Sequence, residues 1–371
     1  MITTKLFKEF FASERSGGFA LISVTVISLI LANAGMPINF HAKFIGLSIE
    51  HWVNDGLMAI FFLMIGLELE REIYEGELSS WSNAALPFYA AIGGMIVPAA
   101  IHFAFNFGTP TQAGAGIPMA TDIAFSLGIL SLFKIPYALK VFLTALAIAD
   151  DLGAIFVIAF FYTKDFHAAY LGGALAVFAV LLVLNRLRIQ NLMPYLIGGV
   201  FMWWLFLNSG IHATISGVLL AFAIPFSKNV HDCVSHKLQR RLHFPVALAI
   251  LPIFAFVNTY LPIDGSLTLL DRNSVGIFLG LVVGKPLGIL GFCALAITLK
   301  LATPLGLSWR HSIGAGILAG IGFTMSIFVS LLAFEHANNS QIAVLIASAT
   351  SAVLGFVWFT WFVPLTEEPA S

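Results

Sequence analysis

Two adjacent carboxylates lie inside an apolar stretch of the chain. Asp150 and Asp151 occur in the run Leu-Ala-Ile-Ala-Asp-Asp-Leu-Gly-Ala at 146–154, and the residues around them from Val141 to Phe161 are almost all apolar. A charge at the centre of a bilayer helix costs at least ~2.5 kcal/mol on insertion scales, so two neighbouring charges indicate a function. Oxygen ligands suit hard cations such as Na⁺, and a carboxylate that exchanges a proton for such a cation would couple the two ions.

Two further ionisable residues, Asp122 and Lys285, also fall in apolar segments. Successive helical residues point ~100° apart, so Asp150 and Asp151 are expected to have different roles. One can line a cation path while the other faces a neighbouring helix. Lys285 needs an anionic partner at that depth, and one of these aspartates could be that partner. A buried pair that only joins two helices is the structural alternative.

An oxygen shell for a cation could be completed beside these carboxylates. Thr121 precedes Asp122, and Pro118 interrupts the segment just before both. A proline removes a helical hydrogen bond, so backbone carbonyls near it can turn toward a bound ion. Asp150 and Asp151 are thus the candidate ligands for transported Na⁺, and Thr121 with the backbone carbonyls around Pro118 could complete the shell.

The elements that position these residues are transmembrane helices. The 371-residue chain is 59% hydrophobic and 10% charged, with a mean hydropathy of +0.95, whereas soluble domains have about 25% charged residues. Its net charge of −1 gives no reason to expect a nucleic-acid partner. We predict an all-α polytopic membrane protein forming one domain over 1–371, in contact with the lipid bilayer and without enzymatic activity or a cofactor.

A span needs about 20 apolar residues, and on this basis the sequence predicts twelve. A short interfacial helix is expected before the first span. The predicted spans are 17–35, 52–74, 84–106, 113–132, 137–162, 167–185, 192–208, 210–226, 244–262, 274–299, 311–334 and 340–364.

Positive charges predict the orientation, because cytoplasmic loops are enriched in Lys and Arg. The N-terminal segment and every second loop hold fourteen of the eighteen, and the opposite loops hold three, which are Lys43, Lys164 and Arg272. Both termini are therefore expected in the cytoplasm. The fourteen are Lys5, Lys8, Arg15, Arg71, Lys134, Lys140, Arg186, Arg188, Lys228, Lys237, Arg240, Arg241, Lys300 and Arg310.

An internal repeat links spans four and eleven. Residues 114–126 and 314–326 both begin Gly-Ala-Gly-Ile and end in Ser, at a fixed offset of 200. Because the two segments lie seven spans apart, the repeats would be inverted, with units at about 84–162 and 274–364. Both segments contain helix breakers at mid-depth, and interrupted helices at matching positions indicate a transporter's ion site.

Several motifs together resemble the NhaA family of bacterial sodium/proton antiporters over almost the whole chain. The matching stretches are Phe62-Leu-Met-Ile-Gly-Leu-Glu-Leu-Glu-Arg-Glu72, Ala91-Ile-Gly-Gly-Met-Ile-Val-Pro98, Ala120-Thr-Asp-Ile-Ala-Phe125, Ala145-Leu-Ala-Ile-Ala-Asp-Asp-Leu-Gly-Ala154, Ser209-Gly-Ile-His-Ala-Thr214, Gly284-Lys-Pro-Leu-Gly-Ile289 and Gly320-Ile-Gly-Phe-Thr-Met-Ser-Ile327.

The resemblance implies a crossing of two broken helices and assigns roles by position. Asp151 would be the principal cation ligand, and Asp150 would pair with Lys285. Asp122 with Thr121 would balance helix N-terminal dipoles at the crossing, and Lys285 the facing C-terminal ends. It further implies electrogenic export of Na⁺ or Li⁺ in exchange for H⁺, activated at alkaline pH, from a bacterial inner membrane.

Two departures from the family pattern affect regulation and assembly. The family carries a Glu-His pair in its proposed pH sensor, where this chain has Gln239-Arg240. The pH-response residues that remain are Glu68, Glu72 and His243. The external loop between spans one and two is shorter than usual. In the family this loop forms a β-hairpin that joins a homodimer, and residues 44–49 could still form a strand.

Two other functions compete with antiport. A sodium-coupled solute symporter of similar fold would need a roomy substrate cavity and no Lys285. An intramembrane aspartyl protease would need two carboxylates sharing a proton, which a nearby lysine would prevent, and its signature motifs are absent from the sequence. A channel is disfavoured by the charge pair at mid-depth.

Overall fold

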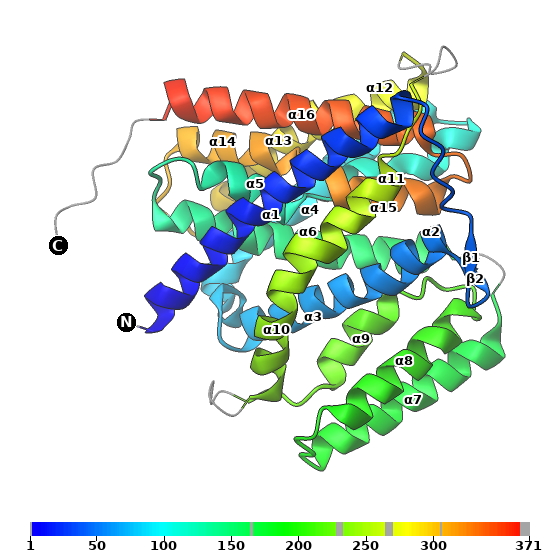
Figure 1. Ribbon diagram of the computed structural model, residues 1–371. Coiled ribbons are helices and arrows are strands. Elements are labelled where there is room, and N and C mark those ends of the chain that lie inside the picture. The colour runs from blue at the N-terminus through cyan, green and yellow to red at the C-terminus, as the bar shows by residue number, and fades with distance from the viewer. Residues whose placement is uncertain (1, 164–165, 228–232, 264–269, 305, 364–371) are drawn as a thin grey trace. The chain divides into compact units, whose positions relative to one another are not determined.

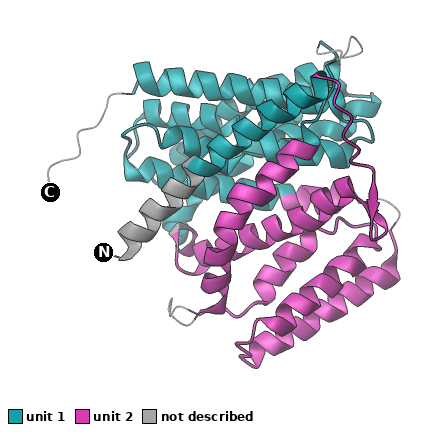
Figure 2. Ribbon diagram, in the orientation of Figure 1, with its two compact units in different colours: residues 1–33, 80–154, 258–371 teal, residues 34–79, 155–257 magenta. Residues whose placement is uncertain are grey.

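Helices make up nearly all of the computed structural model (Figure 1). The structure describes residues 2–163, 166–227, 233–263, 270–304 and 306–363, with side chains from residue 16 onward apart from that of Glu77. The chain forms two compact units (Figure 2). Unit 1 comprises residues 1–33, 80–154 and 258–371, and unit 2 comprises residues 34–79 and 155–257.

The described residues contain eight helical segments that are long and apolar enough to cross a membrane. Two further segments are pairs of helices bent by 41° and 43° at short breaks, so up to ten spans meet the length requirement. The bent pairs coincide with predicted spans four and eleven. The seventh and eighth predicted spans correspond to two shorter apolar helices, α8 and α9. The prediction of an all-helical polytopic membrane protein with two interrupted helices is confirmed.

Unit 1 is built around a pair of packed helices, α4 and the helix that continues through α12, η5 and α13. Helix α12 also packs on α16, and α14 packs on α13 and α16. A π-helical turn, η5, precedes Lys285. The elements of unit 1 are α1 (Ile2–Asn33), α4 (Trp81–Asn106), η3 (Pro110–Met119), α5 (Ile123–Leu130), α6 (Tyr137–Phe161) as far as Ala154, α12 (Arg272–Leu279), η5 (Gly280–Gly284), α13 (Lys285–Thr298), α14 (Trp309–Ala319), α15 (Phe323–Ala333) and α16 (Asn338–Trp361).

Unit 2 has its core where α3, α7, α8 and α9 meet, around the buried side chains of Leu67, Tyr195 and Met202. A two-residue antiparallel hairpin pairs Lys43 with Ser48 and Phe44 with Leu47. The elements of unit 2 are β1 (Lys43–Phe44), β2 (Leu47–Ser48), α2 (Ile49–His51), η1 (Trp52–Leu57), α3 (Met58–Tyr74), η2 (Glu77–Ser79), α7 (Ala168–Arg186), α8 (Met193–Leu207), α9 (Ile215–Ala223), α10 (Val234–Pro245), η4 (Val246–Ile250) and α11 (Leu251–Asn258).

Two predicted boundaries were wrong. The N-terminal segment does not form a separate interfacial helix, because α1 runs without a break from Ile2 to Asn33. The ninth span begins at Val234 rather than at residue 244, and helix continues through η4 and α11 to Asn258. The first turns of α10 are polar and charged, so hydropathy could not reveal them. The predicted strand at 44–49 is present only as the short hairpin.

Candidate functional site

The breaks in the two bent helices lie side by side in unit 1. The chain leaves η3 at Met119 and is extended at Ala120 and Asp122 before α5 begins at Ile123. Gly320 to Gly322 separates α14 from α15. The backbone N–H of Asp122 donates to the carbonyl of Ile321 at 2.7 Å, which joins the two breaks directly. The crossing implied by the family resemblance is therefore a contact between the two backbones.

Asp122 caps two helices at this crossing. Its Oδ1 accepts from the N–H of Phe125 at 3.0 Å, in the first turn of α5. Its Oδ2 accepts from the N–H of Thr324 at 3.2 Å and from the Thr324 hydroxyl at 2.6 Å, in the first turn of α15. Helix N-termini carry partial positive charge, so a carboxylate between two of them is stabilised. Asp122 is buried where these two helix ends meet.

Hydroxyl groups satisfy the carbonyl ends of the broken helices. Ser126 donates to the carbonyl of Leu318 at 2.9 Å, and Ser326 donates to the carbonyl of Ile117 at 2.7 Å. Thr121 Oγ1 lies 2.9 Å from the carbonyl of Ala319. Backbone carbonyls around Pro118 were expected to complete the shell of a cation, and in this structure the carbonyl of Ile117, in η3, accepts from Ser326.

Asp150 and Lys285 form a fully buried ion pair between α6 and the start of α13, both with 0% exposure. Lys285 Nζ donates to Asp150 Oδ2. The same oxygen lies 2.7 Å from the Thr121 hydroxyl. Because one hydroxyl has one proton, Thr121 can donate either to Asp150 or to Ala319 at a given moment. Thr121 thus connects the ion pair to the helix crossing.

Asp151 follows Asp150 on α6 and is also buried, with 1% exposure. It lies close enough to Lys285 to interact with it electrostatically. Among the described residues, no group of three or more His, Cys, Asp or Glu side chains gathers as a resident metal site. The oxygens near Lys285 belong to the two carboxylates, and the Thr121 hydroxyl lies 2.7 Å from Asp150 Oδ2.

The proposed pH-response residues lie in unit 2, where α3 meets α10. Arg71 contacts Glu72 at 2.8 Å and Glu68 at 3.7 Å. On α10, Gln239 is buried, Arg240 is exposed and His243 is half-buried. In the acidic run from Glu68 to Glu77, both Glu68 and Glu70 are buried.

Sequence reasoning missed two contacts that join α3 and its following turn to α10. Ser235 donates to Glu70 Oε2 at 3.1 Å, and His236 lies 3.4 Å from Glu75. These residues precede the predicted start of span nine, so they were read as loop. The half-buried His212 is hydrogen-bonded within unit 2, because its Nε2 lies 3.0 Å from the carbonyl of Tyr162.

Comparison with known proteins identifies the family. The family model described as Na+/H+ antiporter 1 matches residues 8–359. This chain belongs to that family. It is 56% identical over 382 residues to the Na(+)/H(+) antiporter NhaA of Cytophaga hutchinsonii, with 99% of each chain covered. It is 57% identical over 376 residues to the Na(+)/H(+) antiporter NhaA of Dechloromonas aromatica, with 97% of this chain and 96% of the relative covered.

Membership in this antiporter family confirms the resemblance found in the sequence motifs and identifies a transporter rather than an enzyme. The hydroxyl residues Ser126, Ser326 and Thr324 were not predicted as part of the site. The first two close the matched segments at an offset of 200, and that offset was the available signal. Thr324 gave no separate signal, because a threonine in an apolar helix has no unusual cost.

Proposed function

We propose that this chain is an electrogenic antiporter that exports Na⁺ or Li⁺ from the cytoplasm in exchange for inward H⁺. The observation that carries the proposal is the buried Asp150–Lys285 pair, with Asp151 adjacent to it and Thr121 linking it to the crossing of two broken helices. In a chain of the Na+/H+ antiporter 1 family, this group supplies both a cation ligand and proton-exchanging groups.

In the proposed mechanism Asp151 is the principal cation ligand. A proton and Na⁺ compete for its carboxylate, so binding one releases the other. Asp150 holds Lys285 while the site is empty of cation, and releases it when Asp150 is protonated or contributes to ion binding. Two titratable groups then serve one monovalent cation. More than one proton therefore moves per Na⁺, and the exchange carries net charge.

Asp122 and Lys285 have an electrostatic role in this proposal. Asp122 balances the N-terminal ends of α5 and α15, as its hydrogen bonds to Phe125 and Thr324 support. Lys285 was expected to balance the facing C-terminal ends. Its hydrogen bond goes to Asp150, and hydroxyls bond the nearby carbonyls, so its effect on those ends is a longer-range charge interaction.

Inverted repeats at about 84–162 and 274–364 supply the alternating-access framework. Their first helices, α4 and α12–α13, pack on each other within unit 1. Their second elements are the bent pairs η3–α5 and α14–α15, and their third are α6 and α16. The hydrogen bonds of Ser126 and Ser326 run in opposite directions between the bent pairs, as a two-fold relation requires.

The protein crosses the membrane several times, and the bacterial relatives indicate the cytoplasmic membrane as its location. We propose that both termini lie in the cytoplasm, because fourteen of the eighteen Lys and Arg fall on that side. A homodimer through the β1–β2 hairpin is also proposed. The hairpin turn exposes Phe44 at 63% and Ile45 at 76%, and apolar side chains of this kind favour a protein partner.

Regulation by pH is assigned to the cluster between α3 and α10. Glu68 and Glu72 share Arg71, and His243 lies on the facing helix α10, which also carries Ser235 and His236. Gln239 and Arg240 do not titrate in the range of a glutamate and a histidine. The response of this chain would therefore rest on Glu68, Glu72 and His243 together with the site aspartates.

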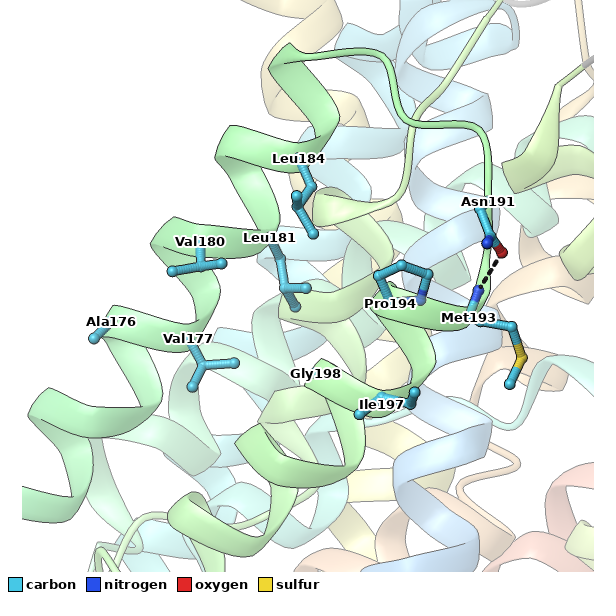
Figure 3. A pocket seen from close by; sticks show the side chains of 10 residues that line it. All are labelled: Ala176, Val177, Val180, Leu181, Leu184, Asn191, Met193, Pro194, Ile197 and Gly198. Carbon is cyan, nitrogen blue, oxygen red and sulfur yellow. Dashed lines mark hydrogen bonds between the residues drawn. The ribbon is translucent and has the colours of Figure 1, made fainter.

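One groove of the described structure offers little support for a symporter. A groove of about 630 Å³ lies between α7 and α8, and Figure 3 shows its lining of aliphatic side chains with Asn191 at one end. None of the proposed site residues lines it. A polar solute would find few hydrogen-bonding partners in this groove, whereas hydrocarbon surroundings would suit the apolar lining.

Proton flux in inside-out vesicles tests the proposed function. Addition of Na⁺ or Li⁺ to respiring vesicles that hold the chain is expected to dissipate the pH gradient across pH 6 to 9, and K⁺ is expected to have no such effect. Vesicles without the chain provide the control. If exchange also required an added organic solute, the symporter alternative would replace antiport.

A further inference from the structure

A second polar cluster in unit 1 lies at the C-terminal end of α4. His102 in α4 has 0% exposure, and its Nε2 lies 3.0 Å from Oδ1 of Asn273 in the first turn of α12. Nδ2 of Asn273 in turn donates to Ser340 Oγ at 2.8 Å, in the first turn of α16. One imidazole thus begins a hydrogen-bond chain through three helices.

The hydrogen-bond donors around His102 determine its tautomer. Asn273 gives its amide hydrogen to Ser340, so its Oδ1 accepts, and His102 Nε2 must carry a hydrogen. The Asn106 amide 3.4 Å from the same nitrogen then cannot donate to it, and instead donates to the carbonyls of His102 and Arg272. Nδ1 of the neutral ring is an acceptor, and no described residue bonds it.

The ring is tightly enclosed. A Cβ added to Gly114 of η3 would lie 3.1 Å from His102 Cε1, and one added to Gly276 of α12 would lie 3.1 Å from Cδ2. Glycine at both positions lets η3 and α12 approach the imidazole closely. Any change in the hydrogen bonding of His102 would therefore affect the packing of both η3 and α12.

A second proton on His102 would place a positive charge in neutral surroundings. Among the described residues, those that the structure places against the ring include Asn273, Asn106, Gly114 and Gly276. The described residues of η3 carry no titratable side chain, and His102 is the only acidic or basic residue of α4. The charged groups next in sequence are Asp271, which caps α12, with Arg272, and then Glu335 and His336 before α16.

Two helix N-termini also point toward this site, those of α12 and α16, and their partial positive charge opposes an imidazolium. An unpaired charge in a buried site costs several kcal/mol unless the structure opens to water or to a counter-charge. We propose that His102 is a proton-binding site separate from the aspartates. Its protonation opens the tie between α4, α12 and α16, which is the hydrogen-bond chain from His102 through Asn273 to Ser340.

The proposed orientation puts this tie at the non-cytoplasmic ends of the three helices, where protons enter during exchange. External acid would then loosen the outer end of the proposed repeats and speed opening to that side. This location rests on the proposed function, whereas proton binding and local opening do not. The test therefore measures opening directly and needs no transport.

Hydrogen–deuterium exchange of the purified full-length protein tests the proposal. After correction for the intrinsic pH dependence of exchange, peptides from the first turns of α12 and α16 should lose protection at least threefold between pH 7.5 and 5.5. His102→Gln keeps an N–H donor for Asn273 but cannot titrate, so its protection should stay constant. His311→Gln, at another buried histidine of unit 1, should respond like the wild type.

A second variant keeps the test decisive if His102→Gln does not fold or is open at every pH. Asn273→Asp places a carboxylate against the ring, so the imidazolium would gain a charged partner and the tie would stay closed in acid. An acid response in Asn273→Asp equal to that of the wild type would overturn the proposal. So would equal responses in His102→Gln and the wild type, whatever the outcome of transport measurements.

Discussion

At the scale of single residues, the two adjacent aspartates differ because of what faces them. Asp150 points at Lys285 and Thr121, so its negative charge is compensated inside the protein. Asp151 lies one position further around α6, ~100° away, and is buried beside the pair. The hydrogen bond from Lys285 supports Asp150 as the partner of the lysine. We propose that Asp151 is the cation ligand.

Substitution of Lys285 by alanine should lower the thermal stability of the purified protein. Removing one partner of a buried ion pair leaves an uncompensated charge, at a cost of ~3–5 kcal/mol. Adding Asp150→Asn removes that charge and should recover part of the loss. Thermal unfolding of the two single variants and the double variant gives the coupling. Strict additivity would mean that the two side chains do not interact.

The aspartates themselves could be predicted from the sequence, because charges in an apolar segment are costly. The choice of Asp150 rather than Asp151 for Lys285 came from the family resemblance and not from helix geometry, because it depends on the rotation of α6 about its axis. The capping of two helices by Asp122 through Thr324 was also beyond the sequence, since it needs residues 202 positions apart to meet.

At the scale of elements, hydropathy located the regular spans well. The spans predicted at 84–106, 137–162 and 340–364 agree with α4, α6 and α16 within a few residues. Hydropathy failed to locate helices correctly where their formation depends on packing rather than on lipid contact. The polar start of α10 is stabilised by its contact with α3, and η3 adopts a tighter 3-10 helix in a segment with two prolines.

The packing of α4 on α13 gives a prediction about Gly288. A Cβ at this position would lie 2.1 Å from the carbonyl oxygen of Gly93, so Gly288→Ala must push the helices apart. We expect a loss of ~1–3 kcal/mol in stability and weaker exchange, because Lys285 lies one turn away.

Gly291→Ala on the same helix is the matched control for Gly288→Ala. An added Cβ there meets no atom within 4 Å, so this change should be neutral or stabilise the helix by up to ~1 kcal/mol. Thermal unfolding and sodium-driven proton flux of both variants provide the measurements. Equal behaviour of the two variants would argue against the close helix contact.

At the scale of the whole molecule, coupling of several protons to one cation should make exchange electrogenic. A membrane potential, negative inside, should therefore drive Na⁺ efflux from proteoliposomes when the pH difference is held at zero. Collapsing the potential with valinomycin and K⁺ should slow the initial rate. An unchanged rate under those conditions would show that exchange is electroneutral and that one proton moves per cation.

The pH profile should depend on both the cation site and the cluster between α3 and α10. Protons compete with Na⁺ for Asp151, so the apparent Na⁺ affinity should fall as the medium becomes acidic. Gln239→Glu adds a titratable group beside this cluster and should move the activity profile along the pH axis without abolishing exchange. Gln239→Asn is the non-titrating control. An identical profile in Gln239→Glu at saturating and sub-saturating Na⁺ would exclude this position from the sensor.

The central claim is that a carboxylate at Asp151 exchanges protons for Na⁺. Calorimetric titration of the purified protein with Na⁺ in buffers of different ionisation enthalpy counts the protons released per cation bound. At pH 8 the wild type should bind Na⁺ with net proton release, and Asp151→Asn, folded and inserted like the wild type, should neither bind Na⁺ nor release protons. Unchanged Na⁺ binding in Asp151→Asn, or binding by the wild type without proton release, would contradict the account.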